Sequence, residues 1–182
     1  MKKPKKEEKP LSGAQDAYEW LQILIVALVT IILVFTFVGR ITPVVGESML
    51  PTLHEGDVML IRDIGYTDPQ PGDIVVLTKE FDAARGPIVK RIIAVEGQTV
   101  DIDYQTGTVY VDGEALDEPY LNEPMEEPWY EDLTSVTVPE GSVFVMGDNR
   151  NHSNDSRDVT LGTVDTRYLL GKAEFICFPF SD

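Results

Sequence analysis

The sequence predicts a mainly β domain carried by a single membrane-spanning helix near its N-terminus. Two observations support this class: residues 21–38 contain no charged side chain, and short runs rich in β-branched residues, separated by glycine and proline, follow them. With 43% hydrophobic and 25% charged residues, the 182-residue chain is neither disordered nor collagen-like. Its length suits one domain with an appendage.

The apolar run at residues 21–38 has the length of a transmembrane helix. Such a run rises about 27 Å as a helix, and Tyr18 and Trp20 extend it to the headgroup level of a bilayer. We therefore expect residues 18–39 to form a membrane anchor. A buried core helix or a cleaved secretory signal is the alternative, but the run is apolar on every side and no small-residue cleavage site follows it.

The charges around this run predict its orientation. Five lysines, two glutamates and two prolines lie within the first ten residues, as in a solvated tail, whereas only Arg40 follows the run closely. The excess of positive charge on the N-terminal side predicts a cytoplasmic tail at residues 1–17 and an extracytoplasmic domain at residues 40–182.

The overall charge and the cysteine count exclude several classes of site. A net charge of −16 argues against nucleic-acid binding, because phosphates require a basic face. Residues 112–132 hold nine acids, three prolines and no base, which predicts a solvated acidic excursion from the fold. One cysteine excludes an intramolecular disulfide and, with two histidines, a four-cysteine or two-cysteine, two-histidine zinc site.

The part of the chain after residue 40 is predicted to form strands, since no helical period of twelve residues occurs there. Asp112 and Gly113 are predicted to form the turn of a hairpin. The predicted strands are residues 58–61, 73–77, 88–95, 99–102, 108–111, 142–146 and 173–178.

Ser48 lies in a segment whose composition predicts a fixed bend. Gly46 precedes it and Pro51 follows it. A serine in such a bend is suited to being exposed and oriented as a nucleophile. A serine in an ordinary loop is the alternative, and two familiar nucleophile motifs are missing: residue 50 is leucine, so Gly-x-Ser-x-Gly is incomplete, and Ser-x-x-Lys does not occur.

Lys90 and Arg91 are adjacent within the predicted strand at residues 88–95. Successive side chains of a strand point to opposite faces, and both faces are apolar around this pair, so one of the two charges is expected to lie against the core. A lysine there has a lowered pKa and can act as a base, whereas an arginine remains protonated. Alternation does not decide between them, and an edge strand with snorkelling side chains is the alternative.

A polar loop, residues 147–157, directly follows a predicted strand. Its asparagine, aspartate and serine side chains are suited to bonding their own backbone. The four charged side chains Asp148, Arg150, Asp155 and Arg157 are also suited to forming a paired network at the end of a strand.

These three segments together resemble bacterial type I signal peptidases. The resemblance rests on Ser-Met-x-Pro-Thr-Leu shortly after an anchor, Lys-Arg in a strand, and Gly-Asp-Asn-Arg-x-x-Ser-x-Asp-Ser-Arg, in the family's order. It covers residues 18–180, and the short chain with one anchor resembles the Gram-positive form. It implies an extracytoplasmic domain of coiled antiparallel sheets, and a membrane-bound serine endopeptidase that removes signal peptides from secreted preproteins after Ala-x-Ala-type sites.

The resemblance also implies a role for each matching residue. Ser48 is expected to be the nucleophile, with its main-chain N–H as one oxyanion donor, and Lys90 the general base. Ser153 and Asp155 are expected to support the lysine, Ser153 by a direct hydrogen bond to its amine and Asp155 by pairing with Arg157.

The neighbouring positions carry further expectations. Asp148 and Arg150 are expected to belong, with Arg157, to a structural network. Some family members have a serine where this chain has Gly46, so a second, hydroxyl oxyanion donor is missing here; glycine is common at this position in the Gram-positive form. Val44 and Met49 are expected to wall the pockets that accept small residues. No metal or cofactor is expected, since a serine–lysine mechanism needs neither.

Three other interpretations remain open. A hydrolase with a histidine base would use His54 or His152, although two histidines in a chain of this size are usually incidental. A sortase-like transpeptidase would need Cys177 as a thiolate, but its apolar surroundings favour a buried structural cysteine. A non-catalytic β-module would bind without cleaving any peptide.

The expected partners are preproteins emerging from the secretion translocon and the lipid bilayer, without nucleic acid. Only nine residues separate Val38 from Ser48, so Ser48 is expected near the outer membrane–water boundary of the cell membrane. Anchoring enzyme and preprotein in one membrane raises their effective concentration.

Overall fold

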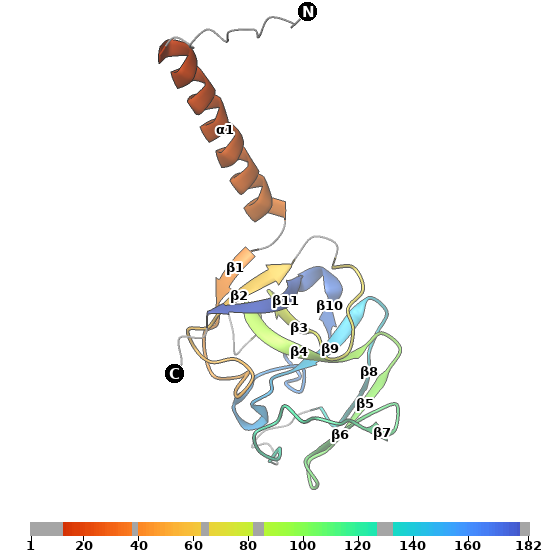
Figure 1. The fold of residues 1–182 in the computed structure, drawn as a ribbon. Coiled ribbons are helices and arrows are strands. Elements are labelled where there is room, and N and C mark those ends of the chain that lie inside the picture. Colours follow the sequence, from red (N-terminus) through yellow and green to blue (C-terminus); the bar gives the residue numbers. More distant parts are fainter. Residues whose placement is uncertain (1–12, 38–39, 63–65, 82–85, 127–132, 179–182) are drawn as a thin grey trace, which may run out of the picture. The chain divides into compact units, whose positions relative to one another are not determined.

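The computed structural model describes residues 13–37, 40–62, 66–81, 86–126 and 133–178. The chain divides into two compact units, Met1–Val38 and Gly39–Asp182. Of the described residues, those of the first unit form helix α1 and those of the second form the strands, as Figure 1 shows. This division agrees with the predicted class of a mainly β domain carried on an N-terminal apolar helix.

Helix α1 (Gly13–Phe37) is the predicted apolar segment. It begins five residues before the predicted anchor, so residues 13–17, which were expected in the basic tail, are helical; the lysines of that tail lie outside the described residues. Its stretch Gly13–Leu33 is long and apolar enough to cross a membrane, and every side chain of that stretch is exposed. A helix that is apolar all round has the character of a membrane-spanning segment.

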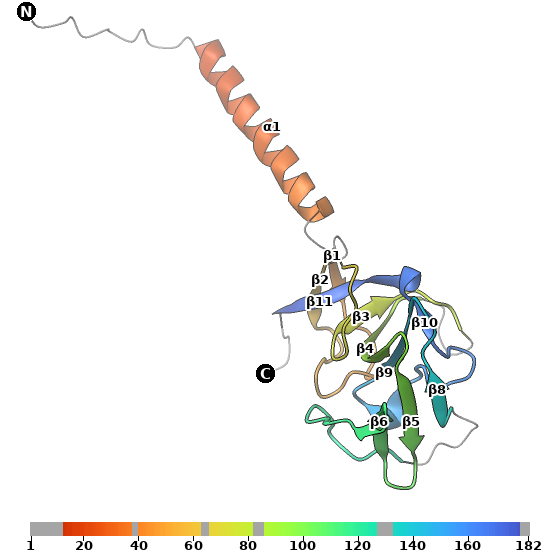
Figure 2. The same ribbon diagram turned by 90° about the vertical axis from the view of Figure 1, so that its right-hand side faces the viewer.

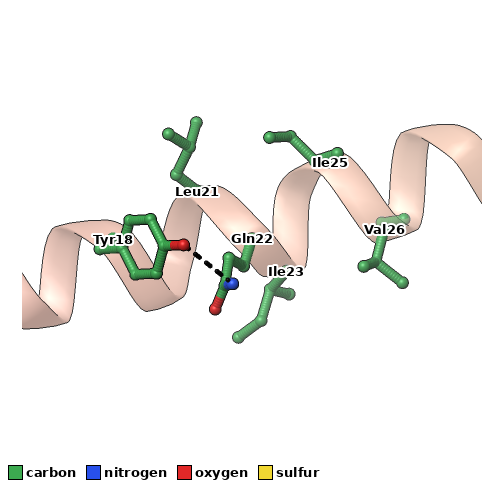
Figure 3. Close-up of a pocket in the computed structure, with 7 residues that line it drawn as sticks. Tyr18, Leu21, Gln22, Ile23, Ile25 and Val26 are labelled. Atoms are coloured by element: carbon green, nitrogen blue, oxygen red, sulfur yellow. Dashed lines mark hydrogen bonds between the residues drawn. The ribbon is translucent and has the colours of Figure 1, made fainter.

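Two polar side chains of α1, Gln22 and Thr30, find partners within the helix. Gln22 Nε2 donates to the Tyr18 hydroxyl at 3.3 Å, one turn away, as Figure 3 shows among the apolar side chains of this stretch. The Thr30 hydroxyl donates to the Val26 carbonyl at 2.8 Å. Because polar groups in hydrocarbon must be satisfied internally, these bonds suit a membrane-spanning helix.

The second unit consists of two antiparallel sheets (Figures 1 and 2). The larger has the strand order β1-β2-β11-β3-β4-β9-β10, and the smaller has the order β7-β6-β5-β8. Both views show β5 and β6 at the end of this unit away from β1 and β2. The strands are β1 (Arg40–Pro43), β2 (Val58–Arg62), β3 (Ile74–Leu77), β4 (Ile88–Val95), β5 (Thr99–Asp103), β6 (Thr108–Val111), β7 (Glu114–Ala115), β8 (Ser135–Thr137), β9 (Ser142–Met146), β10 (Val164–Asp165) and β11 (Leu169–Phe178).

All seven predicted strands are present. The bounds of β4, β6 and β9 agree with the prediction, while β11 begins four residues earlier than expected. Four further strands, β1, β7, β8 and β10, were not predicted. They have two to four residues each, too few to display an alternating pattern, and they form by pairing with longer neighbours.

Strands β4 and β9 join the two sheets into one body. Their side chains enter two core clusters on opposite faces: Ile92 and Val145 pack with Leu77 and Leu161, whereas Phe144 packs with residues of β5 and β6. A third cluster lies beneath the loop between β1 and β2 and holds Val44, Met49 and Leu53. These buried side chains hold the loop that carries Ser48 on the large sheet.

The predicted hairpin at Asp112-Gly113 is confirmed. Both residues have positive φ, 52° and 83°, as a two-residue turn between twisted strands requires, and Val111 pairs with Glu114 across it.

The described part of the predicted acidic excursion, residues 112–126, is mostly exposed, but two of its side chains attach it to the domain. Met125 is buried in the core beside Phe144, and the Glu118 carboxylate pairs with the buried Arg150 guanidinium. Composition alone suggested solvation, but one apolar side chain and one buried cation hold this acidic segment on the domain. Residues 127–132 lie outside the described residues.

Candidate active site

The structure brings Ser48 and Lys90 into direct contact. Lys90, the third residue of β4, donates from Nζ to the Ser48 hydroxyl at 2.6 Å and to the Val89 carbonyl at 3.0 Å. The residue is only 3% exposed, so it is the lysine of the Lys90–Arg91 pair that faces inward. Among the described residues, no carboxylate forms an ion pair with it.

Burial has the effect on Lys90 that the sequence suggested. It lowers the pKa of the amine from 10.5 to about 8, against the charges of Asp155 and Asp148, which raise it, and with the charge of Arg157, which lowers it further. About a tenth of the lysine is therefore neutral at pH 7, and a neutral amine can accept a proton from a hydroxyl.

The loop between β1 and β2 positions Ser48 as the predicted bend requires. Gly46 has a φ of +88°, a left-handed conformation that favours glycine, and the Leu50 N–H donates to the Glu47 carbonyl at 3.1 Å. Met49 and Val44 are buried in the core cluster beneath. Ser48 itself remains partly exposed.

The polar loop that follows β9 holds the main chain of the Ser48 segment. The Asn149 N–H donates to the Ser48 carbonyl at 3.0 Å, and its side-chain amide donates to the Glu47 carbonyl at 3.1 Å. A methyl group on Gly147 would lie 2.5 Å from Ser153 Cβ and closer still to the Ser48 carbonyl oxygen. Only glycine therefore permits this approach. Sequence reasoning placed Gly147 and Asn149 in a motif but assigned neither a role.

Asp155 is the centre of this loop. Its fully buried carboxylate accepts from the Gly147 N–H at 2.9 Å, the Ser153 hydroxyl at 2.7 Å and the Arg157 guanidinium at 2.8 and 3.0 Å. Burial alone raises the pKa of Asp155, but the charge of Arg157 and these hydrogen bonds outweigh it and hold the pKa below the usual value. The expected Asp155–Arg157 pair is confirmed.

The expected direct hydrogen bond from Ser153 to Lys90 is absent among the described contacts. The Ser153 hydroxyl donates to the buried Asp155 carboxylate, a charged acceptor. Ser153 thus contacts the Asp155 carboxylate and packs against Gly147.

Arg91, on the opposite face of β4, is held by Asp148. The guanidinium forms a two-pronged pair with that carboxylate at 2.8 and 2.6 Å, and the Thr52 hydroxyl donates to the same carboxylate. The Tyr120 ring covers the guanidinium, with its centroid 4.0 Å from Arg91 Cζ. Asp148 therefore links the β4 strand to the Ser48 segment through Thr52, which agrees with the structural role expected for it.

Among the described residues, no hydrogen bond or ion pair joins the side chain of either histidine to Ser48 or Lys90. His54 and His152 are exposed, and Cys177 lies in β11, with its side chain outside the described part of the chain. No group of three His, Cys, Asp or Glu residues in the described ranges converges as a metal site would.

Known proteins resemble this chain over nearly its whole length. The model of the family described as signal peptidase, peptidase S26, matches residues 17–178. The probable signal peptidase I-1 of Synechocystis is 41% identical over 172 residues, covering 90% of this chain and 83% of that protein. The signal peptidase I of Bacillus licheniformis is 36% identical over 184 residues, covering 97% and 96%.

Two further proteins are similar. The signal peptidase IB of Staphylococcus aureus is 34% identical over 185 residues, covering 92% of this chain and 93% of that protein. A crystal structure of a signal peptidase I from Enterococcus faecalis is 32% identical, covers 59% of this chain and 98% of its own, and has a TM-score of 0.48. The family match over most of the sequence, with relatives above 30% identity, shows that this chain belongs to the signal peptidase family, peptidase S26, and is a membrane-anchored serine peptidase.

Proposed function

We propose that this protein removes signal peptides from preproteins with Ser48 as the nucleophile and Lys90 as the general base. The observation that carries the proposal is the 2.6 Å contact between Lys90 Nζ and Ser48 Oγ, formed by a buried amine without a carboxylate partner in the described part of the chain. A buried lysine paired with a carboxylate would stay protonated, whereas this one loses its proton near pH 8.

The reaction follows from this contact in two halves. Neutral Lys90 takes the Ser48 proton as Oγ attacks the scissile carbonyl carbon, and the resulting ammonium gives that proton to the leaving amine as the peptide bond breaks. A water molecule then attacks the acyl-serine ester while Lys90 takes its proton. That proton returns to Ser48 Oγ as the ester bond breaks, which restores the free serine hydroxyl and the neutral lysine.

Two groups support the geometry of this reaction. The Val89 carbonyl accepts one N–H of Lys90 at 3.0 Å and so fixes the amine toward Ser48. The Ser48 N–H has no acceptor among the described residues, which leaves it available to the oxyanion. With glycine at position 46, a second donor must come from the main chain or from water.

Substrate selection is proposed to depend on Val44, Gly46 and Met49. The side chains of Val44 and Met49 are buried rather than lining an open wall, so we place them as the floor of a shallow subsite. Space beside Gly46 is open, since a methyl group there would meet nothing within 4 Å. A shallow, apolar floor accepts the methyl group of alanine and rejects larger side chains, as Ala-x-Ala sites require.

The membrane is proposed to be the second partner. Ile41, only four residues after the end of α1, lies opposite Leu60, which lies opposite Phe175, so the three share one face of β1, β2 and β11. Ile41 is 54% exposed and Phe175 is 68% exposed. We place this apolar row against lipid, with the N-terminus cytoplasmic, the domain outside, and the preprotein delivered by the translocon in the same bilayer.

The test is cleavage of a membrane-inserted preprotein bearing Ala-x-Ala by the full chain in liposomes. Ser48→Ala and Lys90→Ala are expected to abolish cleavage, while replacing the final alanine of the substrate with phenylalanine prevents it. Lys79→Ala is the matched control. Lys79 is also a partly buried lysine with a lowered pKa that donates to carbonyls, at Leu161 and Thr163, but it does not contact Ser48.

Each outcome has a definite meaning. Cleavage by wild type and Lys79→Ala, lost in both dyad variants, supports the proposal. Cleavage by Lys90→Ala would assign the base elsewhere, and His54 and His152 would then be substituted. A wild type that leaves the preprotein intact in lipid would contradict the proposed activity.

A further inference from the structure

The acidic segment after β7 contacts the hydrogen-bond network around the candidate site at two separate points. Two of its residues, Glu118 and Tyr120, which we call the clasp, were assigned no role from the sequence. They are joined to each other, because the Tyr120 hydroxyl donates to Glu118 Oε1 at 2.8 Å.

The first arm runs from Glu118 to the Ser48 main chain. Its carboxylate holds the Arg150 guanidinium by a two-pronged pair, and Arg150 is completely buried, so this carboxylate neutralises a charge with no access to water. Arg150 Nε in turn donates to the Gly147 carbonyl at 3.0 Å. Gly147 packs directly against the Ser48 carbonyl, so a shift of Arg150 displaces the surface on which that peptide rests.

The second arm runs from Tyr120 to the same segment by another path. Its ring covers the Arg91 guanidinium, which grips Asp148, and Asp148 accepts the hydroxyl of Thr52. Thr52 lies four residues after Ser48 in the same loop. The clasp is therefore connected to the Ser48 loop by two paths, one that ends at Gly147 and one that ends at Thr52.

A third connection holds the clasp segment in place. The Asn151 side chain accepts from the Glu126 N–H at 2.9 Å and donates to Glu123 Oε1 at 2.9 Å, and Met125 is buried in the core. The segment is thus anchored on the polar loop at residues 118, 120 and 123–126.

We propose that Glu118 and Tyr120 are positioning residues that hold the Ser48 loop against Lys90 through Arg150 and Arg91. Neither contacts Ser48 or Lys90 in the structure, so neither is catalytic. The inference rests on the proposed function, since the geometry being held is that of the nucleophile and its base. Small displacements of reacting groups cost rate more than binding, so loss of the clasp is expected to lower kcat and leave KM nearly unchanged.

The test compares Glu118→Gln and Tyr120→Phe in the full chain in liposomes with the wild type. Glu118→Gln leaves Arg150 without its counter-charge and is expected to lower kcat at least about tenfold, with KM within about twofold. Tyr120→Phe keeps the ring on Arg91 and loses only the bond to Glu118, so a smaller loss of kcat is expected. Glu114→Gln, the same charge change on the exposed strand β7, is the control and is expected to keep wild-type kcat and KM.

A second measurement does not depend on activity. Hydrogen–deuterium exchange of the Asn149 amide, which donates to the Ser48 carbonyl, is expected to accelerate about tenfold or more in Glu118→Gln. Exchange of the Val138 amide, which donates to the Gln98 carbonyl away from this loop, is the internal reference and is expected not to change.

The outcomes separate this inference from the proposed function. Suppose first that the wild type cleaves, so that the proposed function stands. The clasp is then overturned if both clasp variants keep the wild-type kcat. It is also overturned if exchange of the Asn149 and Val138 amides changes equally in these variants. If the wild type does not cleave, the proposed function fails. Acceleration of Asn149 exchange alone would still show that the clasp holds the Ser48 main chain in place. Unchanged Asn149 exchange overturns the clasp in either case.

Discussion

Two of the Asp-x-Arg sequences in this chain, in two different regions, pair their own aspartate with their own arginine. Asp155 and Arg157 pair in the loop after β9, and Asp165 and Arg167 pair at the end of β10, with the same spacing and the same carboxylate–guanidinium contacts. The first pair is buried and the second is exposed. The sequence spacing is identical, so the difference arises from what surrounds each pair.

The surroundings decide what each pair does. Asp165 only closes a local turn, accepting from the Arg167 N–H at 2.9 Å, whereas Asp155 also accepts from Gly147 and Ser153, which flank the Ser48 main chain. Water competes for the charged groups of an exposed ion pair, so such a pair contributes little to folding stability. In a buried pair, loss of one partner leaves the charge of the other without compensation. Lys90 is a third case, a buried cation that the described residues leave without a carboxylate.

The largest expected effect comes from breaking the buried pair. Asp155→Asn removes the buried carboxylate that accepts from the Arg157 guanidinium, and is expected to lower the free energy of unfolding by about 3–5 kcal/mol. Asp165→Asn makes the same change in the exposed pair and is expected to leave stability nearly unchanged. Urea unfolding of both variants in detergent checks this, and equal losses in the two would contradict the role assigned to burial.

The next effect comes from removing the unpaired cation. Lys90→Met abolishes the proposed base but is expected to raise the free energy of unfolding at pH 6 by up to about 3 kcal/mol, because the folded state no longer holds a charge whose pKa is depressed from 10.5 to about 8. This gain is complete below pH 8, where native Lys90 is charged, and declines as the pH rises from 8 toward 10.5. Thermal unfolding at pH 6 and pH 10 measures it; a gain that does not decline with pH would contradict the assignment to Lys90.

A smaller effect is expected in the pH dependence of cleavage. Since neutral Lys90 is the active form, kcat/KM is expected to rise about tenfold per unit below pH 8 and to level off above it. Asp155 raises the pKa of Lys90 and Arg157 lowers it, so Asp155→Asn is expected to move this rise to lower pH, while Asp165→Asn leaves it in place. A rise that stays fixed in Asp155→Asn would show that the buried pair does not act on Lys90 electrostatically.

The smallest effect is expected at the exposed histidines. His54→Gln and His152→Gln change titratable groups outside the buried network, and both are expected to keep the wild-type rate and pH profile. Initial rates between pH 6 and pH 9 check this. Loss of the alkaline rise in either variant would move the base from Lys90 to that histidine.

The candidate site was predictable where a motif or a period carries the information. The apolar run at 21–38, the β-branched run at 88–95 and the Asp112-Gly113 turn predicted the helix, strand β4 and a hairpin. The direction of the Ser153 hydroxyl was not predictable, because a nearby lysine and a nearby carboxylate are equally compatible with its position in the sequence. Only packing placed Asp155 within 2.7 Å of it.

The sequence by itself determined the class of the protein: an apolar helix long enough to span a bilayer, a β domain, and a serine and a lysine in recognisable segments. These depend on composition, periodicity and local spacing, which are properties of short stretches of chain. The tertiary structure alone decided that Lys90 rather than Arg91 faces inward, and that Glu118 holds Arg150. Both depend on burial and on contacts between residues 32 or more positions apart, which follow from how the sheets pack.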